Sequence, residues 1–323
     1  MKYTFATLLL SCFSLTSSAQ SDTLIRFFDY LYREVPEKGS VYSALTIIQK
    51  MDDGNFMVQD FYLKTGKIMR RSYSSDTILQ NRIGPYEVFY ENGKRKTKGI
   101  FNKNTPNGVW REWDDEGHLT DSVFYNMDGH MTGTRIQWHS NGNVSDSTVY
   151  AQDGSGRGES YEWYSPGQLR GKGEKINDRK NGMWMYYQRS GKPASEETYI
   201  IDSLISIRCF DDKGNKIDKD CVGEVDADFP GGMKAWQQYI AKKVYSNANE
   251  LIKKGANGTA IVLFIIDTTG KVIDARLESK TNSYLDEFAL RTINNSPRWI
   301  PARQHNITVK AYRRQPITYQ EEE

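Results

Sequence analysis

The sequence of 323 residues has few of the side chains that most metal centres and catalytic sites need, with 4 histidines and 3 cysteines. This scarcity argues against a zinc site or a Cys–His catalytic pair. The 43 basic and 41 acidic residues nearly balance, which excludes a polyanion binder that works through bulk charge. Hydrophobic residues make up only 38%, but aromatic residues reach 12% and there are 26 glycines, so the chain is not of the aromatic-poor disordered class.

Catalytic motifs are also lacking. The histidines His118, His130, His139 and His305 are scattered, and none stands at the spacing of a metal ligand pair. The sequence contains no H-E-x-x-H, no G-x-S-x-G and no phosphate loop ending in G-K-[ST]. We therefore expect a protein without enzymatic activity, metal or cofactor.

Long apolar runs are absent too. The longest beyond the N-terminus is Ala260–Ile266, far short of a membrane span. Residues 1–19 read as a signal peptide, with Lys2, an apolar stretch, and Ser17-Ser18-Ala19 before the cleavage point. The sequence thus predicts export. The alternative is a lipoprotein of the cell envelope, lipidated at Cys12, and only then is direct membrane contact expected.

What the sequence does have is an internal repeat of 24 or 25 residues. One set of glycines recurs at this spacing; a second glycine follows each by nine positions, and an aromatic residue follows each by five. Glycine supplies the positive φ of tight turns, so each unit predicts a strand, a tight turn, a second strand and a looser turn. The first glycines are Gly84, Gly108, Gly133, Gly158 and Gly182, the second are Gly93, Gly117, Gly142, Gly167 and Gly191, and the aromatic residues are Phe89, Trp113, Trp138, Trp163 and Tyr187.

These five aromatic residues are expected to form the core of the repeat sheet, because stacked hairpins bury a face that one hairpin cannot bury alone. Side chains alternate along a strand, so the first, third and fifth positions after the first glycine should share that face. In two units the set is Thr134, Ile136, Trp138 and Met183, Met185, Tyr187. Core packing is favoured over a ligand-binding groove.

The units resemble the MORN repeat, in a variant also found in an antitoxin family. The shared pattern is G-x-W-x-x-[FWY]-x-x-x-G, as in Gly108–Gly117, and the resemblance covers about residues 50–220. It implies a repetitive β-sheet that serves as a binding surface or a spacer. Arg135 departs from the pattern, because it stands where its unit should have the first aromatic residue.

The composition changes after Cys221. Residues 226–320 contain 14 basic and 8 acidic residues, a net charge of +6. Apolar residues three to four apart predict a helix over 233–244, and a second helix is expected over 286–294. Strands are expected over 259–266 and 271–277, joined at Gly270, and a last strand over 309–319 is broken near Pro316.

This order of helix, strand, strand, helix and strand resembles the C-terminal domain of TonB, as found in Bacteroidetes envelope proteins. One departure is Tyr245-Ser246, where the family usually has Tyr-Pro. The fold class is therefore a mainly β array of stacked antiparallel hairpins followed by a small α+β two-layer domain. The matching motifs are Phe229-Pro230-Gly231-Gly232, Gly258–Leu277, Leu285–Arg291, Ser296–Ala302 with Trp299 and Pro301, and Tyr312–Ile317.

The resemblance implies a periplasmic adaptor that binds outer-membrane transporters or other envelope proteins and supports TonB-linked transmembrane transport. In that family, an extended segment of the transporter adds a strand to the edge of the sheet. Lys310, Arg313 and Arg314 either attract an acidic partner segment or only keep the edge from aggregating. Carried over here, the edge is the last strand, around Val309, Lys310, Ala311, Tyr312 and Arg313.

The alternative is a structural or recognition protein that binds through its repeat sheet, with no role in energy transduction. A full energy transducer has a transmembrane helix and a long proline-rich spacer, whereas this sequence has 9 prolines in all. On either reading the partners are proteins and not nucleic acids.

The predicted domains are a signal peptide (1–19), an N-terminal cap (20–50), repeats (51–221), a TonB-like domain (222–320) and a tail (321–323). Cys209 and Cys221 flank a turn-rich segment at the end of the repeats. In an oxidising compartment they either form a structural disulfide or remain two thiols.

Overall fold

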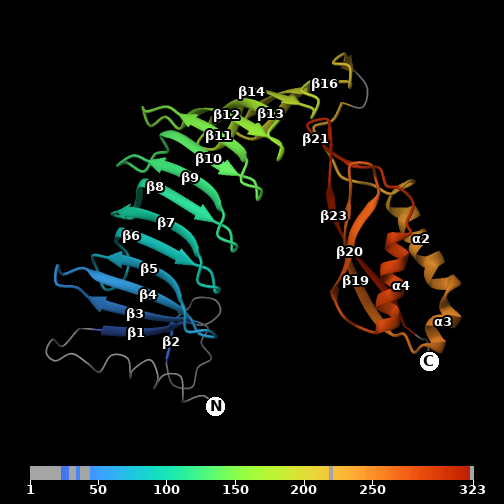
Figure 1. Ribbon diagram of the computed structural model, residues 1–323, viewed down its shortest axis with the longest axis horizontal. Helices are drawn as coiled ribbons and strands as arrows, with labels where there is room; N and C mark the ends of the chain where they lie inside the picture. The colour runs from blue at the N-terminus through green and yellow to red at the C-terminus, as the bar shows by residue number, and fades with distance from the viewer. Residues whose placement is uncertain (1–22, 29–33, 37–43, 218–220, 321–323) are drawn as a thin grey trace. The chain divides into compact units, whose positions relative to one another are not determined.

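The computed structural model of the chain describes residues 23–28, 34–36, 44–217 and 221–320 (Figure 1). The predicted signal peptide with Cys12, and the predicted tail at 321–323, lie outside the described residues. The described chain divides into two compact units. The first contains the residues up to Gly158 with Ser165–Gly167, and the second contains Glu159–Tyr164 and the residues from Gln168 on. The last repeats thus belong to the same compact unit as the C-terminal domain.

The repeat region forms an antiparallel sheet of 17 described strands, which confirms the predicted array of hairpins. From β3 to β11, and again from β13 to β17, each strand pairs with the next along the chain. The strands are β1 (Thr23–Phe28), β2 (Glu34–Val35), β3 (Ala44–Lys50), β4 (Phe56–Tyr62), β5 (Ile68–Ser74), β6 (Arg82–Phe89), β7 (Arg95–Asn102), β8 (Thr105–Trp113), β9 (Leu119–Tyr125), β10 (Gly133–Trp138), β11 (Val144–Tyr150), β12 (Arg157–Trp163), β13 (Leu169–Ile176), β14 (Arg179–Tyr187), β15 (Pro193–Ile200), β16 (Ser203–Phe210) and β17 (Lys216–Ile217).

The first strands of this sheet lie in the region that the sequence assigns to a cap. β1 pairs with β3 over six residues and also with β2, so residues 23–28 and 44–50 are strands of the same sheet as the repeats. The sheet therefore begins before residue 51.

Some of the turns between units are tighter than the sequence predicts, whereas the connections from β9 to β10 and from β11 to β12 are the looser ones expected. Lys103 and Asn104 both have positive φ (47° and 67°), as do Ile201 and Asp202 (48° and 66°). These are two-residue turns of the type that matches the twist of a β-hairpin. The expectation of a looser turn at these points is wrong, since Asn and Asp tolerate the left-handed conformation that glycine usually supplies.

The buried face of the repeat strands is the opposite of the one predicted. In β14, Trp184 and Tyr186 are fully buried, whereas Met183 is 63% exposed. A register shift separates Tyr186 from Tyr187, and equivalent shifts precede Phe89, Trp113 and Trp138. Each shift is a β-bulge, which interrupts the alternation of side chains. Counting back from the fifth-position aromatic residue therefore selects the wrong face.

The five aromatic residues expected to be the core, namely Phe89, Trp113, Trp138, Trp163 and Tyr187, are only half-buried. Main-chain groups at three of these positions receive hydrogen bonds from tyrosines one unit earlier. Tyr62 donates to the carbonyl of Phe89 at 2.9 Å, and Tyr90 donates to that of Trp113 at 2.8 Å. Tyr164 donates in the same way to the carbonyl of Tyr187 at 2.8 Å. These positions therefore hold successive turns together.

The large rings of the buried face lie on glycines of the neighbouring strand. A Cβ atom on Gly99 would lie 2.1 Å from the ring of Trp110, and one on Gly173 would lie 2.5 Å from the ring of Trp184. Gly171 pairs with Tyr186, and a Cβ atom on Gly171 would lie 2.8 Å from the Tyr186 ring. Only a residue without a side chain leaves this space, which accounts for the glycines at these strand positions, whereas most other glycines of the repeats have positive φ.

Carboxylates with paired donors fill much of the remaining buried face. Asp121 is 8% exposed and accepts a hydrogen bond from Arg135 at 2.6 Å and from Gln137 at 2.8 Å. Arg135 is the residue that departs from the aromatic pattern, and this ion pair explains why it is tolerated there. Asp60 is similarly buried and contacts Arg70 at 2.6 Å. Pairing is what allows such charges to be buried.

The end of the repeats is closed by a disulfide between Cys209 in β16 and Cys221, whose Cα atoms are 5.4 Å apart. The described chain then continues into the C-terminal domain, which has a predominantly aliphatic and aromatic core that includes Trp236, Phe264 and Leu285. Its elements are β18 (Glu224–Val225), α2 (Gly232–Ser246), α3 (Ala248–Lys253), β19 (Gly258–Ile266), β20 (Val272–Ser279), α4 (Ser283–Asn294), β21 (Ala302–Gln304), β22 (Ile307–Val309) and β23 (Ala311–Tyr319).

The C-terminal domain has two small sheets. One has the order β20-β19-β23, and its helices lie to one side of it (Figure 1). The other has the order β18-β21-β22. The main helices and strands agree with the predicted order, while the hairpin β21–β22 and the short helix α3 were not expected.

We predict that Gly99→Ala destabilises the protein by about 1–3 kcal/mol, because the added methyl group overlaps the Trp110 ring. The midpoint of urea unfolding measures this. Lys98→Ala, at an exposed position beside it in β7, is the matched control and should leave the midpoint nearly unchanged. Equal midpoints for the two variants would contradict the glycine–ring contact.

Candidate protein-binding edge of the C-terminal domain

The last strand, β23, is an edge of its sheet. It pairs with β19 along its whole length, from Ala311 opposite Ile266 to Tyr319 opposite Gly258. Among the described residues, no strand pairs with its other side. An unpaired edge of nine residues presents main-chain donors and acceptors to a partner.

The residues predicted for this edge divide between two strands. Ala311, Tyr312 and Arg313 begin β23, and Tyr312 is 77% exposed. Val309 belongs to β22 instead, where it pairs with Ala302, and Lys310 connects the two strands. The sequence predicts one strand from 309 to 319, because no turn residue separates Val309 from Ala311.

Pro316 shows which main-chain groups face outward. Proline has no N–H, so it fits an uninterrupted ladder only where its nitrogen points away from the neighbouring strand. Its carbonyl accepts a hydrogen bond from the Gln315 side chain at 2.7 Å, in agreement with this orientation. Because main-chain direction alternates along a strand, Tyr312, Arg314 and Thr318 also turn their N–H and C=O groups to the open edge.

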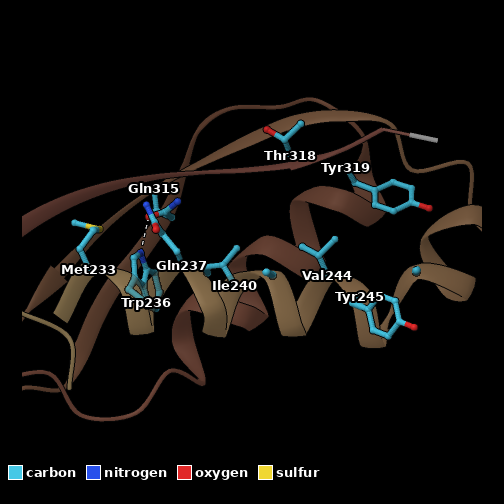
Figure 2. A pocket seen from close by; sticks show the side chains of 11 residues that line it. Met233, Trp236, Gln237, Ile240, Val244, Tyr245, Gln315, Thr318 and Tyr319 are labelled. Atoms are coloured by element: carbon cyan, nitrogen blue, oxygen red, sulfur yellow. Dashed lines mark hydrogen bonds between the residues drawn. The ribbon is translucent and has the colours of Figure 1, made fainter. Parts of the chain in front are cut away.

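A groove of about 550 Å³ runs between this strand and helix α2 (Figure 2). From the helix come Met233, Trp236, Ile240 and Val244, which form the apolar stripe predicted from the sequence. Met233 is 65% exposed and Tyr245 is 86% exposed, so large apolar surfaces face solvent here. From β23 come Gln315, Thr318 and Tyr319. The groove therefore places apolar side chains directly beside free main-chain groups.

Trp236 holds the helix against the strand. Its indole N–H donates to the side-chain oxygen of Gln315 at 2.6 Å, as the dashed line in Figure 2 shows. The ring is 3% exposed and packs against Phe229, Tyr239 and Trp299. A buried indole needs a partner for its N–H, and here the partner comes from the edge strand itself.

The Phe229-Pro230-Gly231-Gly232 motif starts this helix. Phe229 is buried at 5% exposure, and Gly231 and Gly232 have φ values of 87° and 78°. Residues with a Cβ atom rarely adopt such φ values, which accounts for the two glycines. The motif thus fixes the point at which α2 begins, and with it one wall of the groove.

Trp299 ties the loop before β21 to the β19–β20 turn. Its main-chain N–H donates to the carbonyl of Gly270 at 2.8 Å. A Cβ atom on Gly270 would lie 2.0 Å from the Trp299 carbonyl oxygen. Pro301 is half-buried and follows Ile300, which pairs with Asp228 next to the motif.

Two of the three basic side chains of the edge already have acidic partners. Arg314 contacts Glu278 on β20 at 2.7 Å, and its hydrogen bonds hold the pKa of Glu278 below its usual range. Arg313 lies 3.9 Å from Asp226 and donates to the carbonyl of Ala227. Lys310 is exposed. Of the two roles predicted for these charges, attraction of an acidic segment is thus left mainly to Lys310.

The described residues contain no cluster of three or more His, Cys, Asp or Glu that could hold a metal ion. Within the same part of the chain, no helix is long and apolar enough to cross a membrane. The arrangement at β23 is suited to binding an extended peptide through main-chain hydrogen bonds.

Family comparisons agree with this geometry. Residues 243–320 match the family described as Gram-negative bacterial TonB protein C-terminal. The chain carries a TonB-type C-terminal domain. Residues 82–103 match the MORN repeat variant, which confirms the second resemblance. The TonB-type domain supports protein partners and a place in the cell envelope or periplasm.

No curated protein matches the chain. Among solved structures, one of TarM is 19% identical with a TM-score of 0.21, and it covers 32% of this chain and 19% of its own. A mutant of S. aureus TarM in complex with fondaparinux, alpha-GlcNAc-glycerol and UDP has 19% identity, a TM-score of 0.22 and the same coverage. The chain thus spans only 19% of the length of these proteins, and likenesses this low support no conclusion about it.

The sequence did not reveal the groove or the hydrogen bond between Trp236 and Gln315. The two residues are 79 positions apart, and a glutamine in an edge strand carries no signal of its own. The amphipathic stripe of α2 was visible, but periodicity alone does not say whether such a stripe is covered.

We predict that Gly270→Ala destabilises the C-terminal domain by about 1–3 kcal/mol more than Gly255→Ala does. Both positions have positive φ (82° and 59°), so both variants share the left-handed strain of about 1–2 kcal/mol. Only at Gly270 does the new methyl group overlap another main chain, whereas the space around Gly255 is open. Chemical unfolding followed by tryptophan fluorescence measures the difference, and equal losses would refute the packing of Trp299 on this turn.

Proposed function

We propose that the protein is a non-enzymatic adaptor of the periplasm that engages outer-membrane transporters, or another envelope protein, by β-strand addition to β23. The observation that supports this most directly is the open edge of β23 beside the apolar groove of α2. The TonB-type family match supports a protein partner in the envelope. Export by the predicted signal peptide is part of the proposal, with a lipoprotein anchored at Cys12 as the alternative location.

The partner segment that fits this site is extended and has apolar side chains on one face. Its main chain would bond to the outward groups of Tyr312, Arg314 and Thr318. Alternate side chains would then enter the groove against Met233, Ile240 and Val244. A strongly acidic segment is not required, because Arg313 and Arg314 have acidic partners within the domain.

In-cell photo-cross-linking tests this proposal. A photoreactive residue at Thr318, on β23 and in the groove, should form adducts with an outer-membrane transporter, identified by mass spectrometry. The same residue at Ser279, on the opposite edge strand β20, is the control and should give few adducts. Adducts of equal yield from both edges would count against strand addition at β23.

The groove is tested in the same cells. Met233→Glu should lower the Thr318 adduct at least about fivefold, since a charge in an apolar contact costs roughly 1 kcal/mol or more. Gln238→Glu, at an exposed position of α2 outside the groove, adds the same single negative charge and is the matched control. If the two variants lower the yield equally, the groove is not part of the binding site.

A second candidate function is recognition through the repeat sheet, without a role in energy transduction. It is favoured by apolar side chains that are exposed at the same position of three successive units, namely Ile100, Phe124 and Val149. Val109 pairs with Phe124 and each is 43% exposed, while Val149, opposite Thr134, is 54% exposed. Exposed apolar rows of this kind are common in protein interfaces.

This candidate predicts that Phe124→Ser abolishes partner recovery by the full chain, while Thr134→Ser at a polar position of the same face does not. Co-purification from envelope extracts, scored for the same transporter or envelope protein, distinguishes the two functions. If Phe124→Ser leaves recovery intact and Met233→Glu removes it, the repeats are a spacer.

A further inference from the structure

The turn of the β21–β22 hairpin contacts the last repeat. His305 and Asn306 form this turn, and both have positive φ (55° and 59°). The His305 ring stacks on Tyr186 of β14, with ring centroids 3.6 Å apart and planes 6° apart. The Asn306 amide donates to the carbonyls of Ala194 at 3.2 Å and Phe210 at 3.0 Å. These contacts join residues about 100 positions apart within one compact unit.

Glu197 of β15 is the centre of the contact. Its side chain is fully buried, and its carboxylate lies 2.9 Å from Nδ1 of His305. Ser195 donates to the same carboxylate at 2.7 Å, and Tyr199 also donates. Burial opposes ionisation of Glu197, but the hydrogen bonds from His305, Tyr199 and Ser195 hold its pKa below the usual range. A carboxylate buried in this way needs all of its donors.

The surface that receives the turn is special to the last repeat. Fifteen positions after the first glycine of each unit, the earlier units have Gly99, Val123, Thr148 and Gly173, and only the last has a carboxylate, Glu197. Four positions after that glycine, only the last unit has an aromatic ring, Tyr186. Ile307, next to the turn, packs on the cluster of Trp184, Tyr186 and Tyr199. The two residues whose side chains contact His305, Glu197 and Tyr186, are thus ones in which the last repeat differs from the rest.

We propose that β14 and β15 form a receptor for the His305–Asn306 turn, and that this contact mounts the TonB-type domain on the end of the repeat array. The partner of this surface is therefore the hairpin of the same chain, recognised by its imidazole ring, its amide and its left-handed turn. β22 follows the turn directly and is separated from β23 only by Lys310. A pulling force on β23 would therefore be transmitted to the repeat sheet by this hairpin as well as by the main chain at Cys221. The proposal does not depend on which partner binds β23.

The test uses the full mature chain with residues 218–220 replaced by a protease recognition sequence. After cleavage the pieces are held by the disulfide between Cys209 and Cys221, and after reduction only by non-covalent contacts. We expect the reduced pieces to elute together in size-exclusion chromatography. Separation of the reduced pieces, with circular dichroism showing that both remain folded, would overturn the proposal.

Variants of the turn identify the contact. His305→Gly with Asn306→Gly keeps a turn that positive φ allows and removes both side chains, so the reduced pieces should separate. Lys103→Gly with Asn104→Gly alters a turn of the same kind in an earlier unit and should leave them together. Co-elution of the pieces despite the His305 and Asn306 changes would refute the receptor.

Hydrogen exchange on the uncut chain gives a second readout that needs no cleavage. The amides of Gln304 to Ile307 should exchange at least about tenfold faster in the double-glycine variant, and Glu197→Gln should give a smaller acceleration because it keeps the volume of the side chain. Unchanged exchange in both variants would also contradict the mounting contact.

Discussion

The close approach of a large ring to a glycine on the neighbouring strand is the contact on which the repeat sheet depends. Trp110 over Gly99 and Trp184 over Gly173 fill the space that two facing side chains would otherwise share. The ring then covers main-chain atoms and needs no aliphatic partner. Paired charges such as Asp121 with Arg135 occupy the gaps between rings. This is why a chain with few aliphatic residues can form a long sheet.

The C-terminal domain is stabilised by a core of aliphatic and aromatic side chains. The proposed binding site lies where this core ends, beside β23. Alternate residues of β19 are buried beneath the helices, and Trp236 and Phe229 extend this core to the edge strand. Past Trp236 the apolar stripe of α2 continues into solvent with Tyr245. The apolar face of α2 therefore has two roles. Its inner part packs in the core and stabilises the domain, and its outer part is exposed and available for binding.

Much of this architecture could be predicted from the sequence, because glycine spacing and apolar periodicity are local signals. Gly117 places the turn between β8 and β9 correctly, and Met233 to Val244 define the face of α2. Gly108, which was expected in a turn, lies inside β8 instead. The buried face of the repeats was mistaken because a bulge before Tyr187 changes the alternation, and a bulge leaves no mark in residue type. The contacts of Gln315 and Glu197 were not foreseeable, since each depends on residues about 80 to 110 positions away.

Pro316 limits the self-association of the protein through the open edge of β23. An edge strand can be copied by a second molecule, and repeated copying leads to fibres. At Pro316 the open edge has no N–H to offer, and the carbonyl there is already taken by Gln315. Any strand that adds must therefore leave a gap in its ladder, which divides the edge into two short stretches. A partner whose side chains fill the groove of α2 gains binding free energy that offsets the missing hydrogen bond. A second copy of β23 gains only the hydrogen bonds of the interrupted ladder. The open edge of β23 therefore favours binding of a partner segment over self-assembly.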